Sequence, residues 1–130
     1  MRATHIHICE IMTPDPITVQ ASDSIIRAAE IMSEYEVGLV PVYSGKELRG
    51  VLTDRDIVLR HVAKGSACGQ VVGDILSSRI CSIPPEGSLD TAIQMMESNG
   101  VRRLLVLDKR GQLAGVVSKT EILRYLRSRL

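Results

Sequence analysis

Apolar residues recur with a helical period in two separate stretches of the chain. The eight positions are Ile25, Ala28, Ala29 and Met32, and then Leu89, Ala92, Ile93 and Met96. Each set follows the spacing i, i+3, i+4, i+7, which places its members along one face of a helix. Ser22-Asp23-Ser24 precedes the first set and Gly87-Ser88 precedes the second, so each helix has a capping hydroxyl at its start. The pattern predicts two amphipathic helices, each with one face packed on a sheet.

The two stretches are copies of one unit, because the first set returns at a spacing of 89 − 25 = 64 residues. In the first copy the helix is expected to end near Val37-Gly38, and Leu39–Val42 and Leu48–Leu52 are expected to form strands joined by a turn at Gly45. Shorter strands are expected to precede the helices at 17–19 and 81–83. In the second copy Asn99-Gly100 predicts a left-handed helix stop, followed by a strand at 104–107. The chain is therefore predicted to form two half-domains, residues 1–66 and 67–130.

A strand that passes directly into a helix occurs once in each copy. The first junction reads Gly-Val-Leu-Thr-Asp-Arg-Asp from Gly50 to Asp56, and the second reads Gly-Val-Val-Ser-Lys-Thr-Glu from Gly115 to Glu121. The first backbone N–H groups of a helix lack partners within it and lie at the positive end of its dipole, so such a junction favours an anion. In the first copy the helix is expected to turn Ile57, Val58, His61 and Val62 inward.

Composition excludes several classes of partner. Sixteen basic and fifteen acidic residues give a formal charge of +1, which favours neither nucleic acid nor a membrane surface. Three tyrosines are the whole aromatic content, too few for a base-stacking platform. Cys9, Cys68 and Cys81 have no metal-ligand spacing, and no signal peptide or membrane span is evident, so we expect a cytoplasmic protein with reduced thiols.

Other candidate residues carry weaker signals. On a strand His5, His7 and Cys9 would point the same way as possible metal ligands, but a fourth ligand is missing and no metal is expected. His61 has no nucleophile beside it, which favours a structural role. The arginines of the last helix are better explained by its negative C-terminal end than by nucleic acid. Without a catalytic triad, phosphate loop or separated acid/base pair, we expect no enzyme.

The sequence resembles a tandem pair of CBS domains, the Bateman module, over essentially its whole length. The resemblance rests on Met12-Thr13-Pro14, on the Val37–Val42 segment with Pro41, and on Gly50-x-x-Thr53-x-x-Asp56, repeated as Gly115-x-x-Ser118-x-x-Glu121. It implies an α/β (α+β) fold of two pseudo-symmetric halves, each short strand-helix-strand-strand-helix, packed sheet to sheet. It also implies two clefts between the halves that commonly hold adenosine ligands.

The residues of the two junctions predict unequal sites. A threonine hydroxyl suits a phosphate and a short carboxylate suits ribose hydroxyls, so Thr53 and Asp56 are expected to bind a nucleotide, with Arg55 beside them. The resemblance implies that Arg102 and Arg103 reach its phosphates, and backbone near Cys81-Ser82-Ile83 is expected to read the adenine edge. Ser118 and Glu121 are the candidate binding residues of the second cleft, which is expected to be weak or vacant, because they match a capping box in which Glu121 folds back onto its own helix start. Asp56 is a methylene shorter and fits such a box less well.

Two functions stay open. In the first, the chain is a regulatory module that binds an adenine nucleotide, AMP, ADP or ATP, and acts on a partner chain or on its own oligomer. S-adenosylmethionine and a dinucleotide are further candidates for the ligand. In the second, both helix starts are only capping boxes, and the chain is a ligand-free interaction module. Either way, apolar helix surface beyond what one small sheet per half can cover suggests a homodimer, which the resemblance also implies.

Overall fold

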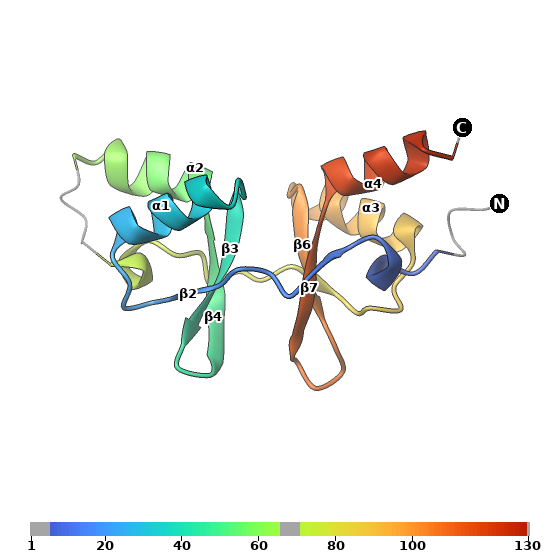
Figure 1. Ribbon diagram of the computed structural model, residues 1–130, viewed down its shortest axis with the longest axis horizontal. Helices are drawn as coiled ribbons and strands as arrows, with labels where there is room; N and C mark the ends of the chain where they lie inside the picture. Colours follow the sequence, from blue (N-terminus) through green and yellow to red (C-terminus); the bar gives the residue numbers. More distant parts are fainter. Residues whose placement is uncertain (1–5, 66–70, 130) are drawn as a thin grey trace. The chain divides into compact units, whose positions relative to one another are not determined.

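The computed structural model describes residues 6–65 and 71–129. The chain divides into two compact units: Ile17–Ile80 forms one, and Met1–Pro16 together with Cys81–Leu130 forms the other (Figure 1). Both are mixed α+β structures, as the sequence predicts. No helix in the described residues is long and apolar enough to span a bilayer.

The Ile17–Ile80 unit is built on a three-stranded sheet of order β2-β3-β4. Strand β2 is parallel to β3, and β3 is antiparallel to β4. Helices α1 and α2 lie on the same side of this sheet (Figure 1). The elements are β2 (Val19–Gln20), α1 (Ile25–Glu34), β3 (Leu39–Ser44), β4 (Glu47–Thr53), α2 (Asp54–Ile57), the π-helical turn η3 (Val58–Val62) and the 3-10 turn η4 (Val72–Asp74).

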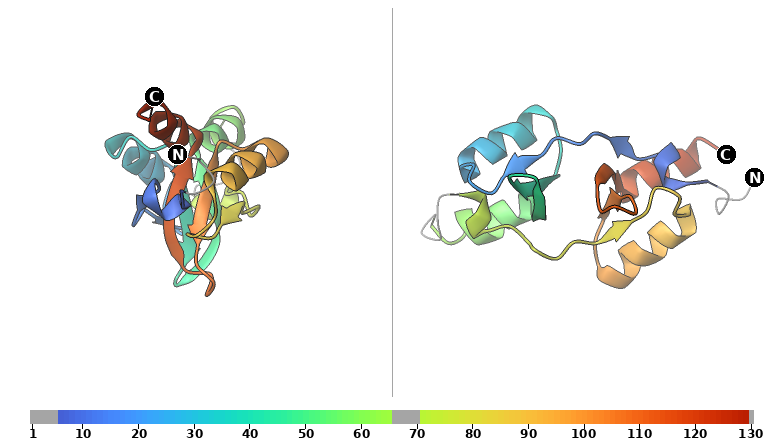
Figure 2. Two further views of the ribbon diagram at one scale, coloured as in Figure 1. Left: turned by 90° about the vertical axis from the view of Figure 1, so that its right-hand side faces the viewer. Right: turned by 90° about the horizontal axis from the view of Figure 1, so that it is seen from below.

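The other unit carries a four-stranded sheet of order β1-β7-β6-β5. Its edge strand β1 comes from the N-terminal segment and runs antiparallel beside β7, as the right panel of Figure 2 shows. The elements are the 3-10 turn η2 (Ile8–Glu10), β1 (Thr13–Pro14), β5 (Ser82–Ile83), α3 (Leu89–Asn99), β6 (Arg103–Leu107), β7 (Leu113–Ser118) and α4 (Lys119–Arg127).

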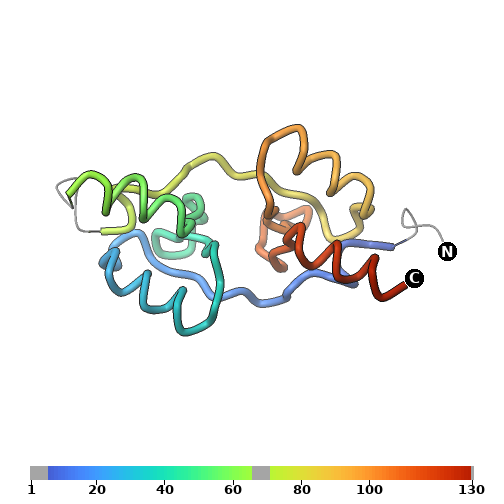
Figure 3. Tube along the Cα trace, turned by 90° about the horizontal axis from the view of Figure 1, so that it is seen from above, coloured from blue at the N-terminus to red at the C-terminus, as the bar shows by residue number. Residues whose placement is uncertain are grey.

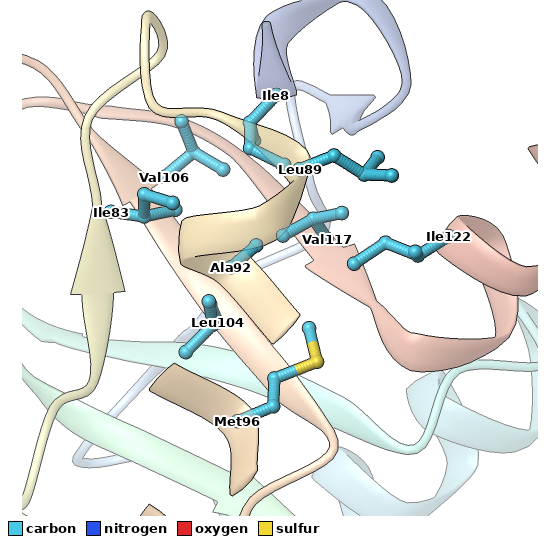
Figure 4. Close-up of a cluster of buried hydrophobic side chains, with 9 residues drawn as sticks. All are labelled: Ile8, Ile83, Leu89, Ala92, Met96, Leu104, Val106, Val117 and Ile122. Atoms are coloured by element: carbon cyan, nitrogen blue, oxygen red, sulfur yellow. The ribbon is translucent and has the colours of Figure 1, made fainter. Parts of the chain in front are cut away.

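Each unit has its own aliphatic core, and the predicted helical stripes supply part of both. Ile25, Ala28 and Met32 are buried in one unit, and Leu89, Ala92 and Met96 in the other. In the second core these side chains meet those of Ile8, Ile83, Leu104, Val106, Val117 and Ile122 (Figure 4). The prediction that each helix packs one apolar face on a sheet is confirmed.

Helix ends follow the predicted capping residues at three of four positions. The hydroxyls of Ser24 and Ser88 accept hydrogen bonds from the third N–H of α1 and α3, and Gly100 ends α3 with φ +63°. Helix α1 ends three residues before Val37, at Glu34, which differs from the expectation. There Glu36 takes the left-handed conformation, with φ +54°, at the position that corresponds to Gly100.

The helix predicted after Thr53 has a different form. Only Asp54–Ile57 is α-helical, and Val58–Val62 continues as a π-helical turn in which Ala63 N donates to Val58 O at 2.8 Å. His61 is buried as expected, but Val58 and Val62 are 55% and 62% exposed. The expectation that these two valines face inward is wrong: the equivalent positions of the regular helix α4, Leu123 and Arg127, are exposed as well, so this face of the helix points away from the core.

At each junction the glycine allows two backbones to approach closely. An added Cβ at Gly50 would overlap the carbonyl oxygen of Ser77, and one at Gly115 would lie 2.6 Å from that of Thr13. Ser77 is bound to the same strand by a reciprocal pair of 2.9 Å hydrogen bonds with Val51. Only a residue without a side chain permits this approach of two backbones.

These contacts explain why the compact units differ from the sequence halves 1–66 and 67–130. The segment that leads into the first repeat packs on β7 of the second, through Thr13-Pro14. The segment that leads into the second repeat packs on β4 of the first, through Ser77. Each unit therefore consists of one repeat body and the leading segment of the other repeat.

We predict that Gly50→Ala lowers the free energy of unfolding by about 3 kcal/mol or more, because the new methyl group displaces the Ser77 backbone and both of its hydrogen bonds. Gly45→Ala is the matched control: Gly45 has open space and φ +62°, so only left-handed strain of about 1–2 kcal/mol is expected. Urea denaturation of both variants measures the difference. Equal losses would contradict the account.

Candidate functional site

The start of α2 is held by a reciprocal capping box. Thr53 ends β4 in an extended conformation and is the N-cap residue. Its Oγ1 accepts from Asp56 N at 3.1 Å, and Asp56 Oδ2 accepts from Thr53 N at 3.0 Å. Asp56 was expected to fit such a box less well than Glu, but it forms both bonds of the box, because the first turn brings its carboxylate within reach of the N-cap N–H.

Asp56 keeps one oxygen that is only loosely engaged. Its Oδ1 lies 3.8 Å from Arg60 Nε, an i,i+4 ion pair in which the Asp56 side chain is 14% exposed and that of Arg60 51%. Arg60 also donates from Nη1 to Ile75 O at 3.2 Å and to Leu76 O at 3.4 Å. Oδ1 therefore retains capacity to accept a short hydrogen bond.

The N–H groups at the start of α2 already have acceptors. Asp54 N donates to Gly38 O at 3.0 Å, and Arg55 N donates to Asp54 Oδ1 at 2.8 Å. Together with the bond from Asp56 N to Thr53, these occupy the first three donors. The expectation of free N–H groups for a phosphate at this helix is wrong, because Asp54 supplies a carboxylate of its own.

At α4 the carboxylate is held at both oxygens. Ser118 Oγ accepts from Glu121 N at 3.1 Å, and Glu121 Oε1 accepts from Ser118 N at 2.8 Å. Glu121 Oε2 accepts from the Thr13 hydroxyl at 2.6 Å, a contact across 108 residues of sequence. The prediction that Glu121 folds back onto its own helix start is confirmed. Glu121 thus has less accepting capacity left than Asp56.

The two predicted arginines stand beside α4. Lys119 N donates to Arg102 O at 2.8 Å, and Arg103 is paired in register with Ser118 between β6 and β7. Gly38 O occupies the corresponding place beside α2. Cationic side chains therefore border the Ser118 helix start within its own unit. Their approach to a phosphate held by Asp56 stays a prediction.

Comparison with known proteins decides the family. The CBS domain model matches the chain twice, at residues 8–62 and 72–128. The chain belongs to the CBS domain family. The two matches fall on the two sequence repeats, and each includes one of the strand-to-helix junctions described above.

Three relatives illustrate the likeness of this CBS pair to known proteins. The CBS domain-containing protein YhcV of Bacillus subtilis is 37% identical over 109 residues, which cover 84% of this chain and 77% of YhcV. The structure of CBSX2 in complex with AMP is 26% identical, with a TM-score of 0.80 and coverage of 94% and 96%. Hypoxic Response Protein I with two coordinated zinc ions is 28% identical, with a TM-score of 0.77 and coverage of 92% and 98%.

The segment expected to bind the edge of the adenine base is Cys81-Ser82-Ile83, and part of it is buried or hydrogen-bonded within its own unit. Ile83 is buried in the core, Cys81 packs against it, and Cys81 O accepts from Leu105 N at 3.0 Å. Ser82 is half-buried and pairs with Leu105 along β6. The Ile83 side chain is therefore excluded as a base contact, and the backbone of Ser82 remains the candidate.

His7 and Cys9 do not lie on the alternating strand that a metal site would need. Ile8–Glu10 is a 3-10 turn, and His7 N donates to Glu10 Oε2 at 2.8 Å. His5 lies outside the described residues. Among residues 6–65 and 71–129, no group of three or more His, Cys, Asp or Glu side chains is placed to hold a metal ion.

Two contacts of the site were not predicted from the sequence. Arg60 is four residues after Asp56, a spacing that could have indicated the ion pair. The contact of Thr13 with Glu121 has no local signal, because it depends on the N-terminal segment packing on the other repeat. His61 is also buried with Nδ1 unpartnered among the residues that the structure describes, and no sequence pattern indicated this.

Proposed function

We propose that this CBS pair is a regulatory module that binds an adenosine-containing nucleotide at the Thr53–Asp56 helix start and performs no turnover of its own. The regulated element is a partner chain or the oligomer of the chain itself. Neither the nucleotide nor the target is identified by the residues, and AMP, ADP and ATP are the first candidates.

The observation that carries the proposal is the unequal state of the two carboxylates. Glu121 has both oxygens in hydrogen bonds of 2.8 and 2.6 Å. Among the residues that the structure describes, Asp56 Oδ1 has no closer partner than a half-exposed arginine, in an ion pair of 3.8 Å. A ribose hydroxyl can therefore bind Oδ1 without breaking the capping bond that Oδ2 makes, whereas at Glu121 it must displace an existing partner.

Other features support a nucleotide at the same place. The Thr53 hydroxyl accepts from Asp56 N and still has its own proton to donate to a phosphate. Arg55 is exposed beside it, and a role for Arg102 and Arg103 at the phosphates stays a prediction. Each charge-assisted hydrogen bond is worth about 1.5–3 kcal/mol. The AMP complex of the CBSX2 relative makes an adenosine ligand a reasonable first test.

The second candidate function is a ligand-free interaction module. It is favoured by the capping boxes at both helix starts, and by the acceptors that Asp54 and Gly38 give to the first N–H groups of α2. In this account Asp56 only stabilises a helix end. Binding measurements on matched variants separate the two functions.

The exposed apolar side chains of the helices are the basis on which a homodimer is proposed. Six of the eight predicted stripe residues are buried in their own cores, and the other two, Ala29 and Ile93, are half-buried. Other apolar side chains of the helices remain in solvent, among them Ile26, Val58 and Val62, each more than half exposed. We propose that these helices pack on a second copy of the chain.

We predict that Asp56→Ala lowers affinity for AMP, ADP and ATP at least tenfold, whereas Glu121→Ala changes it by less than about threefold. The pair is matched, because each variant removes a capping carboxylate and costs roughly 0.5–2 kcal/mol of unfolding free energy. Isothermal titration calorimetry gives both affinities. Equal losses, or two equivalent sites in each wild-type chain, would overturn the assignment to Asp56. Absence of binding by the wild-type chain would favour the interaction module.

We expect sedimentation velocity at roughly 20 μM to give a species of two chains, with or without nucleotide, since a stable homodimer interface survives such dilution. The expected mass is twice the 14.2 kDa of one chain. A single-chain species under both conditions would contradict the homodimer.

A further inference from the structure

Arg60 connects the carboxylate of Asp56 with the segment that follows the η4 turn. Its Nε lies 3.8 Å from Asp56 Oδ1, and its Nη1 donates to Ile75 O at 3.2 Å and to Leu76 O at 3.4 Å. Figure 3 shows this segment, in yellow-green, beside the green turns of α2 and η3. The contacts therefore place one guanidinium between the proposed binding carboxylate and a neighbouring stretch of backbone.

The backbone contacts hold the guanidinium in place. Ile75 is buried in the core of its unit, and Leu76 packs against that core. The next residue, Ser77, exchanges two 2.9 Å hydrogen bonds with Val51 of β4. Carbonyl groups that end a helical turn lack partners within it and attract cationic side chains. Arg60 therefore has a fixed site for one end of its guanidinium, although its side chain is 51% exposed.

The gap between Asp56 and Arg60 has the dimensions of a hydroxyl site. Asp56 Oδ1 is an acceptor and Arg60 Nε is a donor, and at 3.8 Å the two are too far apart for a direct hydrogen bond. The oxygen of a hydroxyl group can lie about 2.8 Å from both atoms, because two sides of this length close a triangle on a base of 3.8 Å. A hydroxyl both donates and accepts, so it can donate to Oδ1 and accept from the guanidinium at the same time.

The second repeat is built differently at this point. The position equivalent to Arg60, at a spacing of 65 residues, is Tyr125, which packs against the core of its own unit. Glu121 Oε2, the equivalent of the oxygen that faces Arg60, already accepts from the Thr13 hydroxyl at 2.6 Å. Of the two helix starts, that of α2 is therefore the one that combines an available acceptor with an arginine donor.

We infer that Arg60 and Asp56 act as a donor–acceptor pair that binds one ribose hydroxyl, and that Arg60 sets the preference of the site for a nucleotide that carries this hydroxyl, an inference that rests on the proposed nucleotide site. When the hydroxyl is missing from the ligand, both partners lose the group that they bind, so such a pair discriminates strongly between the two sugars. An arginine that only stabilised the end of the η4 turn would leave this preference unchanged.

Calorimetric affinities for ribose and deoxyribose forms of one nucleotide test this role. The nucleotide that binds best among AMP, ADP and ATP is compared with its 2′-deoxy and 3′-deoxy forms. The wild-type chain is expected to bind at least one deoxy form about tenfold more weakly than the ribonucleotide. Arg60→Met keeps an unbranched apolar stem and removes the donors. In this variant the ratio is expected to fall at least about threefold, because the ribonucleotide loses affinity and that deoxy form does not.

Two further variants complete the comparison. Arg27→Met is the matched control, because Arg27 forms a 3.5 Å ion pair with Glu30 on α1 of the same unit and its side chain is 58% exposed. Its affinities and their ratio are expected to stay within about twofold of wild type. Arg60→Lys serves if Arg60→Met does not fold. A single amino group cannot contact two carbonyls and a hydroxyl as the guanidinium does, so its ratio is expected to lie below that of wild type.

Each other outcome overturns a distinct claim. An unchanged ratio in Arg60→Met, or in Arg60→Lys where that variant is the one that folds, would overturn the role of Arg60 and leave the nucleotide site standing. Equal binding of the ribose and both deoxy forms by the wild-type chain would overturn the hydroxyl site between Asp56 and Arg60. A wild-type chain that binds none of the three nucleotides would overturn the proposed function, and this inference with it.

Discussion

The fold depends on two places where backbones approach more closely than a side chain allows. Gly50 lies against the backbone of Ser77, and Gly115 lies against that of Thr13. Through these contacts each repeat body holds the leading segment of the other repeat, so neither repeat completes its own unit. The same junctions then turn directly into α2 and α4. The glycine of each junction therefore fixes the strand that leads into the helix. The N-cap residue follows this glycine by three positions, and the carboxylate that bonds to the N-cap N–H follows it by six.

One construction gives two chemically different helix starts. In both, a hydroxyl and a carboxylate exchange hydrogen bonds with the first turn. At α4 the longer Glu121 reaches both its own N-cap and Thr13, which uses its two oxygens. At α2 the shorter Asp56 reaches only the N-cap, and its other oxygen faces Arg60. The two side chains differ by one methylene group. Glu121 uses both of its oxygens within the fold, whereas Asp56 keeps one oxygen that can accept a hydrogen bond from a ligand. The first three N–H donors of α2 are occupied, so in the proposed site it is side chains that would bind a phosphate.

Much of this was predictable from local patterns. The helical spacing of apolar residues and the capping serines predicted the helices α1 and α3 and their buried faces. The repeat of this pattern indicated two equivalent units. The π-helical turn was not predictable, because no local pattern of Val58–Val62 distinguishes it from an α-helix. The exposure of Val58 and Val62 was not predicted either, because apolar side chains at these positions were expected to be buried. The reach of Asp56 to Thr53 N depends on dihedral angles that side-chain length alone does not indicate. The contact between Thr13 and Glu121 is set by the exchange of leading segments, which leaves no local signal.

The central claim is that a nucleotide occupies the Asp56 helix start. Native mass spectrometry of gently purified protein tests it most directly, because it weighs protein and ligand together without a choice of ligand in advance. The account predicts a species that exceeds the protein mass by an adenosine compound per chain, or that gains this mass when AMP, ADP or ATP is added. Protein that stays at its bare mass with each of the three at millimolar concentration would contradict it.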